Sequence, residues 1–438
     1  MSDVDTLIFP RWLLPMAPAD GVLTDHAIAV DGGRIVAVLP AAQACREFDA
    51  RETVELPGHA LLPGFVNAHT HAAMSLMRGL ADDLPLMEWL EGHIWPVEAR
   101  FVSSEFVAHG TELAVAEMLR GGTTCFNDMY FFPGAVAETA VAAGIRASVG
   151  LILIDFPTAW AEGPQEYLDK GFAVHDKYKG HPLVSSMFAP HAPYTVSDGP
   201  LGKMRMYADE LDLRVHMHVH ETAFEVAESE KATGKRPLAR LDELGLLNPG
   251  LLAVHMTQLT EAEIEACATA GVHVLHCPES NMKLASGACP VAALRAAGVN
   301  LALGTDGAAS NNDLDMIGEM RSAALLGKLT ADAADALPAA SVLHMATAGG
   351  AAALGLGDEI GTLEPGKWAD LCAIDLDRVE TRPVYDPIAQ IVYSADRGQV
   401  TDTWVAGRRL LRERELTTID LDTTLARTDE WRERLQAT

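Results

Sequence analysis

Eight short apolar segments constrain the fold of this chain more than any other feature. Helix-like stretches lie between most of them, and this alternation is typical of βα units around a parallel sheet. Eight parallel strands close a (β/α)8 barrel, so we predict an α/β fold with a TIM-like barrel over residues 61–357. The predicted strands are Leu61–Val66, Thr123–Phe126, Ala147–Ile152, Val184–Ala189, Leu213–Met217, Leu251–Val254, Val272–Leu275 and Asn300–Leu303.

The two ends of the chain follow a different pattern. Residues 1–60 contain short strand-like runs separated by Gly and Pro turns, such as Ala27–Val30 and Arg34–Val38. After about Gly357 the helical pattern stops until a terminal helix, and Asp370–Ile374 and Val400–Val405 again read as strands. We therefore predict a small β-sandwich domain that combines residues 1–60 with residues 358–438.

Several predicted barrel strands end in side chains that bind metals. In (β/α)8 barrels the chemistry lies at the carboxyl ends of the strands, and divalent metals bind histidine nitrogen and carboxylate oxygen. A single His-x-His pair also arises by chance, but the other strand ends support a metal site suited to hydrolysis. The residues are His69 and His71 after the first strand, His216, His218, His220 and Glu221 at the fifth, His255 at the sixth and Asp306 at the eighth.

The fifth strand leaves its metal ligand open. Because side chains two residues apart share a face, His216, His218 and His220 all point the same way. Glu221 lies three residues after His218 and can reach a substrate without binding the metal. We expect His216 to pack or to hold another ligand, and His220 to do either.

Asp306 follows the eighth predicted strand. A lone aspartate at such a position is usually a helix cap. Opposite three histidines, it becomes the predicted fourth ligand and general base.

Five motifs occur along the chain in the order Pro63–His71, His218–Thr222, His276–Leu284, Leu303–Gly307 and Gly361–Leu371. Together they resemble the amidohydrolase superfamily, and within it the 5'-methylthioadenosine/S-adenosylhomocysteine deaminases. Triazine chlorohydrolases and guanine deaminases resemble that group in architecture. The likeness covers nearly the whole chain.

The resemblance implies one divalent metal per chain, most simply zinc, with iron, manganese and nickel as alternatives. It implies that His69, His71, His218 and Asp306 hold this metal and that His255 lies beside the attacking oxygen. Glu221 is expected to carry a proton to the purine ring. The implied reaction is hydrolytic deamination at C6 of an adenine nucleoside, with release of ammonia.

Further segments resemble the substrate site of the same family. Glu98 is expected to bind the ribose hydroxyls, His191 to contact the purine, and Trp89 to line the substrate site. No Arg occurs between Arg146 and Arg205 to pair with the carboxylate of S-adenosylhomocysteine, and the loop Asp155–Trp160 suits a methylthio group. We expect 5'-methylthioadenosine as the main substrate, with S-adenosylhomocysteine and adenosine as weaker ones, and a guanine deaminase or triazine hydrolase as the alternative function.

Composition excludes several classes of partner. The formal net charge of -28 disfavours nucleic acids and anionic membranes. We see no basic leader before an apolar stretch and no apolar run of about 18 residues, so we expect neither secretion nor membrane anchoring. Six scattered cysteines without a Cys-x-x-Cys pair are typical of reduced thiols in the cytoplasm. A small purine nucleoside is the expected partner, and the oligomeric state is left open, a homo-oligomer included.

Overall fold

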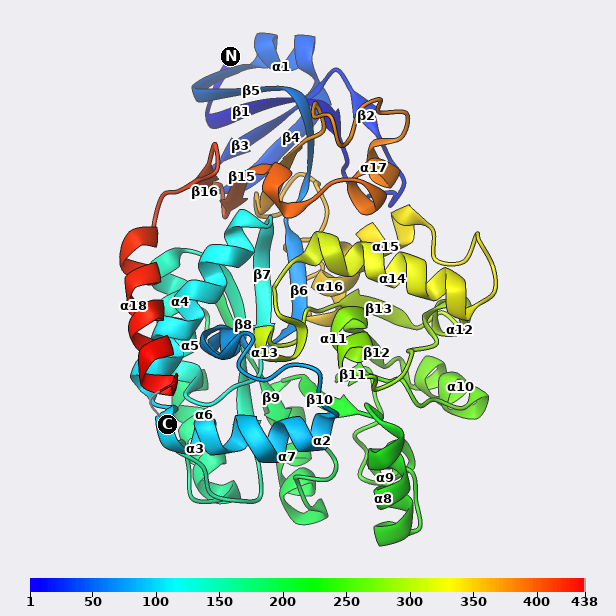
Figure 1. The fold of residues 1–438 in the computed structure, drawn as a ribbon. Helices are drawn as coiled ribbons and strands as arrows, with labels where there is room; N and C mark the ends of the chain where they lie inside the picture. Colours follow the sequence, from blue (N-terminus) through cyan, green and yellow to red (C-terminus); the bar gives the residue numbers. More distant parts are fainter. Residues whose placement is uncertain (437–438) are drawn as a thin grey trace.

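The computed structural model describes residues 1–436, and its strands form two sheets (Figure 1). The first contains eight parallel strands in the order β13-β12-β11-β10-β9-β8-β7-β6, so neighbours in the sheet are consecutive in the chain. This arrangement confirms the predicted barrel. Its strands are β6 (Phe65–Thr70), β7 (Thr123–Asp128), β8 (Arg146–Leu153), β9 (Val184–Pro190), β10 (Val215–Val219), β11 (Leu251–His255), β12 (His273–His276) and β13 (Asn300–Leu303).

The barrel is completed where its first and last strands meet. The backbone N–H of Asp306 donates to the carbonyl of His69 at 3.0 Å, and the Asn67 amide donates to Oγ1 of Thr305 at 2.7 Å. Gly304 permits this approach, because a Cβ there would lie 2.7 Å from the backbone nitrogen of His69. The contact places His69 and Asp306 side by side.

Helices surround the barrel, as Figure 1 shows. Local sequence sets their ends: Thr260 and Glu263 form a capping box before α10, and Gly271 ends that helix at a φ of 72°. No helix within residues 1–436 is long and apolar enough to cross a membrane. The longer helices are α4 (Ser104–Arg120), α5 (Pro133–Ala143), α6 (Pro164–Tyr178), α7 (Asp198–Leu211), α8 (Ala223–Thr233), α10 (Glu261–Ala270), α14 (Met316–Thr330) and α18 (Leu421–Gln436).

Shorter helices connect and close the barrel. At its amino-terminal end, α16 packs so closely that a Cβ on Gly350 would lie 2.8 Å from Cβ of Val66. The opposite end stays available for a site. The shorter helices are α1 (Ala41–Glu47), η1 (Ala72–Met77), α2 (Leu86–Trp89), η2 (Leu90–Ile94), α3 (Trp95–Phe101), α9 (Pro237–Glu243), α11 (Pro278–Lys283), α12 (Val291–Ala296), α13 (Ala308–Asn311), α15 (Ala339–Met345), α16 (Ala348–Ala353), α17 (Pro387–Tyr393) and η3 (Arg397–Gln399).

The second sheet combines both ends of the chain, as predicted. Eight of its nine strands follow the order β17-β16-β15-β14-β5-β1-β3-β4, and β2 pairs with β1. The sheet curls on itself, because Ala369 before β14 donates its N–H to the carbonyl of Gly33 before β4 at 2.9 Å. The strands are β1 (Ser2–Leu13), β2 (Leu23–Thr24), β3 (His26–Asp31), β4 (Arg34–Pro40), β5 (Phe48–Pro63), β14 (Leu371–Asp375), β15 (Val400–Val405), β16 (Arg408–Arg412) and β17 (Glu415–Leu416).

Two details differ from the sequence prediction. The predicted strand Leu61–Val66 is divided, because its first three residues belong to β5 and the barrel strand begins at Phe65. The chain passes between the sheets at Gly64, where a Cβ would lie 2.0 Å from Thr124. The prediction that the helical pattern stops between about Gly357 and the terminal helix was also wrong. Helix α17 lies in this region, and it begins after Asp386, whose side chain caps its first turn. We propose residues 61–357 as the barrel domain, and 1–60 with 358–438 as the second domain.

Candidate active site

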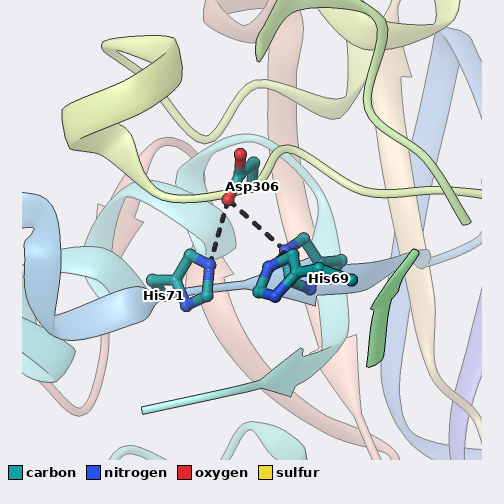
Figure 2. A group of neighbouring side chains, drawn as sticks. His69, His71 and Asp306 are labelled. Atoms are coloured by element: carbon teal, nitrogen blue, oxygen red, sulfur yellow. Dashed lines mark hydrogen bonds and ion pairs between the residues drawn. The ribbon is translucent and has the colours of Figure 1, made fainter. Parts of the chain in front are cut away.

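Four side chains converge at the carboxyl end of the barrel. His69 lies on β6, His71 directly after it, His218 on β10, and Asp306 after β13. One donor atom from each lies within 4.8 Å of all the others. Figure 2 shows Asp306 facing both His69 and His71, with its Oδ1 3.4 Å from Nε2 of His69 and 3.2 Å from Nε2 of His71. The fold therefore brings together the four residues that the sequence selects as ligands.

The outer ring nitrogens of the three histidines have protein partners. Nδ1 of His71 donates to the carbonyl of Met129 at 2.6 Å, and Nδ1 of His218 donates to the carbonyl of His191 at 2.7 Å. Nδ1 of His69 lies 2.9 Å from Nε2 of the buried His216. With its Nδ1 proton engaged, each ring presents Nε2 to the centre, as metal-binding histidines do. His216 thus contacts the candidate ligand His69 rather than the centre of the cluster.

The donor set fits a divalent metal. Ligands about 2.0–2.1 Å from a tetrahedral zinc ion stand about 3.3 Å apart. Nε2 of His218 lies 3.2 Å from Nε2 of His69, close to this spacing. Burial also lowers the pKa of His69 to about 4, so its ring is neutral near pH 7 and able to bind a cation.

The backbone at Asp306 is strained in a way that aims its carboxylate. Asp306 has a φ of 61°, a left-handed conformation that is uncommon outside glycine. Its Oδ1 accepts from the N–H of Gly307 at 2.8 Å, and its Oδ2 accepts from the hydroxyl of Ser280 at 2.6 Å. Although burial raises it, the bonds to His69 and His71 hold the pKa of Asp306 well below its usual range.

Glu221 and His255 lie beside the four candidate ligands without joining the cluster. Nε2 of His255 lies 3.9 Å from Oε1 of Glu221, and its Nδ1 contacts Oδ1 of Asn281 at 2.8 Å. Burial raises the pKa of Glu221, which keeps a proton available on this carboxyl at higher pH than usual. His220 instead accepts from the N–H of Leu238 at 3.1 Å, so it connects the segment after β10 to the first turn of α9.

A cavity of about 470 Å³ opens above this cluster. Trp89, Glu98 and His191, which the sequence selects for substrate contacts, all line it together with Glu221. The hydroxyl of Tyr130 donates to Oε1 of Glu98 at 2.7 Å, and burial raises the pKa of Glu98 to about 7. The cavity is large enough for a nucleoside-sized molecule.

Apolar side chains make up much of the cavity wall. The predicted loop contributes Phe156, Pro157, Thr158 and Ala159, and Ile152 and Ile154 lie beside them. Within residues 1–436, no Lys or Arg lines this cavity. Arg78 does not line the cavity and forms an ion pair with Glu117.

Comparison with known proteins then decides the family. The model of the amidohydrolase family matches residues 60–410. This chain belongs to the amidohydrolase family. It is 50% identical over 436 residues to the 5-methylthioadenosine/S-adenosylhomocysteine deaminase of Teredinibacter turnerae, covering 100% of this chain and 99% of the relative. The corresponding protein of Syntrophobacter fumaroxidans is 45% identical and covers 97% of each chain.

Solved structures agree with this assignment. A zinc-bound adenosine deaminase from Xanthomonas campestris is 56% identical, with a TM-score of 0.99 and full coverage of both chains. The atrazine chlorohydrolase of Arthrobacter aurescens, complexed with zinc, is 24% identical, with a TM-score of 0.91 over 97% of this chain and 99% of the other. This second likeness shows the shared fold.

The amidohydrolase site also includes residues that sequence reasoning missed. Ser280 and Asn281 fall inside the motif His276–Leu284, but the motif does not show that they contact Asp306 and His255. Tyr130 follows β7, and its position after a barrel strand was the available signal. Glu225 had a weaker one, the Thr222-x-x-Glu spacing of a helix start.

Proposed function

We propose that this amidohydrolase is a metal-dependent deaminase that replaces the 6-amino group of an adenine nucleoside with oxygen. We propose 5'-methylthioadenosine as its main substrate and zinc as its metal. The observation that carries the proposal is the shared cavity: Glu98 lines the same space as Glu221 and as three of the four candidate ligands, His71, His218 and Asp306. Relatives named as 5-methylthioadenosine/S-adenosylhomocysteine deaminases and a zinc-bound adenosine deaminase support it.

The reaction adds one water to C6 of the purine and releases one ammonia. A divalent metal held by His69, His71, His218 and Asp306 supplies a lowered water pKa, toward about 7 in the best zinc sites. The residues themselves must then move protons. Oδ1 of Asp306 faces the histidine rings and is placed to take the proton of the attacking water.

Glu221 and His255 have the remaining roles in the proposed reaction. The raised pKa of Glu221 favours a carboxyl that starts protonated and gives its proton to ring N1 as C6 becomes tetrahedral. His255, 3.9 Å from this carboxylate and held by Asn281, is placed to orient the attacking oxygen. The proton taken by Asp306 then passes to the amino group, which leaves as ammonia, and the C6 hydroxyl returns a proton to Glu221 as the carbonyl forms.

Three further residues bind the nucleoside in this proposal. Ionised Glu98 accepts hydrogen bonds from the vicinal ribose hydroxyls. His191, whose Nδ1 lies 3.1 Å from the hydroxyl of Thr195, contacts the purine, and Trp89 packs against the ligand. Together they orient C6 toward Asp306.

The apolar wall supports a preference for the methylthio group. S-Adenosylhomocysteine carries an amino acid end, whose carboxylate normally requires a cationic partner. In the described part of the chain the cavity offers Phe156, Ile152 and Ile154 but no Lys or Arg. We expect kcat/KM to be higher for 5'-methylthioadenosine than for S-adenosylhomocysteine, and the reverse order would refute this preference.

A deamination screen tests the proposal directly. Protein of measured metal content is mixed separately with 5'-methylthioadenosine, S-adenosylhomocysteine, adenosine, guanine and a triazine, and product formation is followed by ultraviolet absorbance. We expect the adenine nucleosides to react and guanine and the triazine to remain. Turnover of guanine or the triazine alone would replace the proposal with the alternative function. Metal analysis of the same protein decides between zinc and iron, manganese or nickel.

We also propose a cytoplasmic location. All six cysteines are free thiols, and five of them are buried within the fold. Reduced thiols are typical of this compartment. Fractionation with an antibody against the native protein tests the proposal, and recovery outside the cytoplasmic fraction would contradict it.

A further inference from the structure

Tyr130 and Glu98 meet across the cavity wall from separate parts of the chain. Tyr130 follows β7, whereas Glu98 belongs to α3. The phenol is buried, with 4% of its surface exposed, and its hydroxyl donates to Oε1 of Glu98 at 2.7 Å. Among residues 1–436, no other hydrogen bond or ion pair reaches the Glu98 carboxylate, so this contact alone orients it.

The contact restricts a side chain that otherwise rotates. Glutamate has three rotatable bonds, and fixing them costs conformational entropy when a ligand binds. A rigid phenol holds Oε1 and leaves Oε2 for the cavity that Glu98 lines. Burial also raises the pKa of Tyr130 well above its usual value, so the hydroxyl remains protonated and able to donate near neutral pH. The carboxylate is therefore oriented before the ligand arrives.

We infer that Tyr130 is a positioning residue that makes this site selective for a vicinal diol, acting through Glu98. The inference rests on the proposed function, in which Glu98 binds the two ribose hydroxyls. The donated bond fixes Oε1, so the other carboxylate oxygen, Oε2, keeps a definite direction toward a ligand. A ligand that lacks the two hydroxyls makes no use of this arrangement.

The test compares Tyr130→Phe with the wild-type holoenzyme on adenosine and on 2',3'-dideoxyadenosine. Loss of a hydrogen bond to a charged group predicts a fall of about tenfold or more in kcat/KM for adenosine, mainly through KM. We expect kcat/KM for the dideoxy compound to change by less than about twofold. Equal losses on both substrates would show a merely structural role and overturn the inference, as would no loss on adenosine.

A double-mutant cycle keeps the inference falsifiable if the dideoxy compound reacts too slowly. The kcat/KM for 5'-methylthioadenosine is measured for the single variants Tyr130→Phe and Glu98→Ala and for the double variant that combines them. Because Tyr130 acts through Glu98, we expect no further loss when Tyr130→Phe is added to Glu98→Ala, and a further loss of about tenfold would refute this. Tyr207→Phe, whose ring packs against Phe172 outside the cavity, controls for removal of a phenol.

The wild-type rate separates the two ideas. If the wild-type enzyme fails to deaminate any adenine nucleoside, the proposed function fails and the inference about Tyr130 fails with it. If the wild type is active and Tyr130→Phe shows no diol selectivity, the inference alone fails. Metal content is measured for every variant, so that metal loss is recognised.

Discussion

The carboxylate of Glu225 holds the backbone of Glu221, accepting from its N–H at 2.7 Å through Oε2. Its Oε1 accepts from the N–H of His220 at 3.1 Å, where the chain has a left-handed φ of 53°. Thr222 completes the turn by capping α8 through the N–H of Glu225. The side chain proposed to donate the substrate proton is thus attached to a segment that a second buried carboxylate fixes.

Replacement of Glu225 tests this support. Glu225→Gln loses one of its two acceptor oxygens, so we expect the loop to shift and kcat to fall roughly ten- to hundredfold with metal retained. Steady-state kinetics and metal analysis measure the two effects. Glu228→Gln, an exposed position on the same helix, is the matched control. Unchanged kcat in Glu225→Gln would contradict the expectation.

The proton donor itself has a sharper prediction. Glu221→Gln keeps the size of the side chain but removes its proton, so turnover should be abolished while all four metal ligands remain. Kinetics on 5'-methylthioadenosine and the metal content of the purified variant measure both properties. A variant that retains its metal and an activity within about tenfold of the wild type would exclude this role.

The acid side of the pH profile should report Glu98. Burial raises the pKa of its carboxyl to about 7, so the group is mostly neutral below this pH. Only above it is the carboxylate mostly ionised and able to accept a hydrogen bond from each ribose hydroxyl. Glu98→Gln does not titrate. The ratio of wild-type to Glu98→Gln kcat/KM should therefore increase between about pH 6 and about pH 8, because this interval lies on both sides of the Glu98 pKa. A flat ratio would mean that ionisation of Glu98 does not matter.

Metal removal should affect both activity and stability. A chelator is expected to abolish deamination, because the lowered water pKa is lost. It should also lower Tm, since a metal that binds the four-ligand site of the native state stabilises that state. Addition of zinc, iron, manganese or nickel in turn should restore both properties to different extents. Full activity in metal-free protein would disprove the role of the cluster.

A buried ion pair joins the two sheets and predicts a stability effect. Arg146 of β8 donates from Nε to Oδ2 of Asp370 at 2.8 Å, and both side chains are almost fully buried. Asp370→Ala leaves the guanidinium unpaired, which should lower the free energy of unfolding by about 3–5 kcal/mol. Denaturant unfolding measures the change, with the exposed Asp377→Ala as control. A loss equal to the control would show that the pair contributes little.

Much of the fold was predictable because its signals are local. Strand alternation and helix spacing are properties of neighbouring residues, so the barrel strands from Thr123 onward were located closely. The continuous apolar run at Leu61–Val66 concealed the exchange between two sheets, because Gly64 matters only through the nearby Thr124. The short α17 escaped notice since seven residues carry little periodic signal.

The sequence by itself determined the strand ends and hence the ligand types, since His69, His71, His218 and Asp306 each lie at or just after the carboxyl end of a recognisable strand. Tertiary structure decided what their side chains meet. Only the folded chain shows that His216 contacts His69, that Tyr130 holds Glu98, and that the cavity in residues 1–436 has no cationic lining. The physical reason is that periodicity depends on residues close together in the sequence, whereas these contacts join segments far apart in the chain.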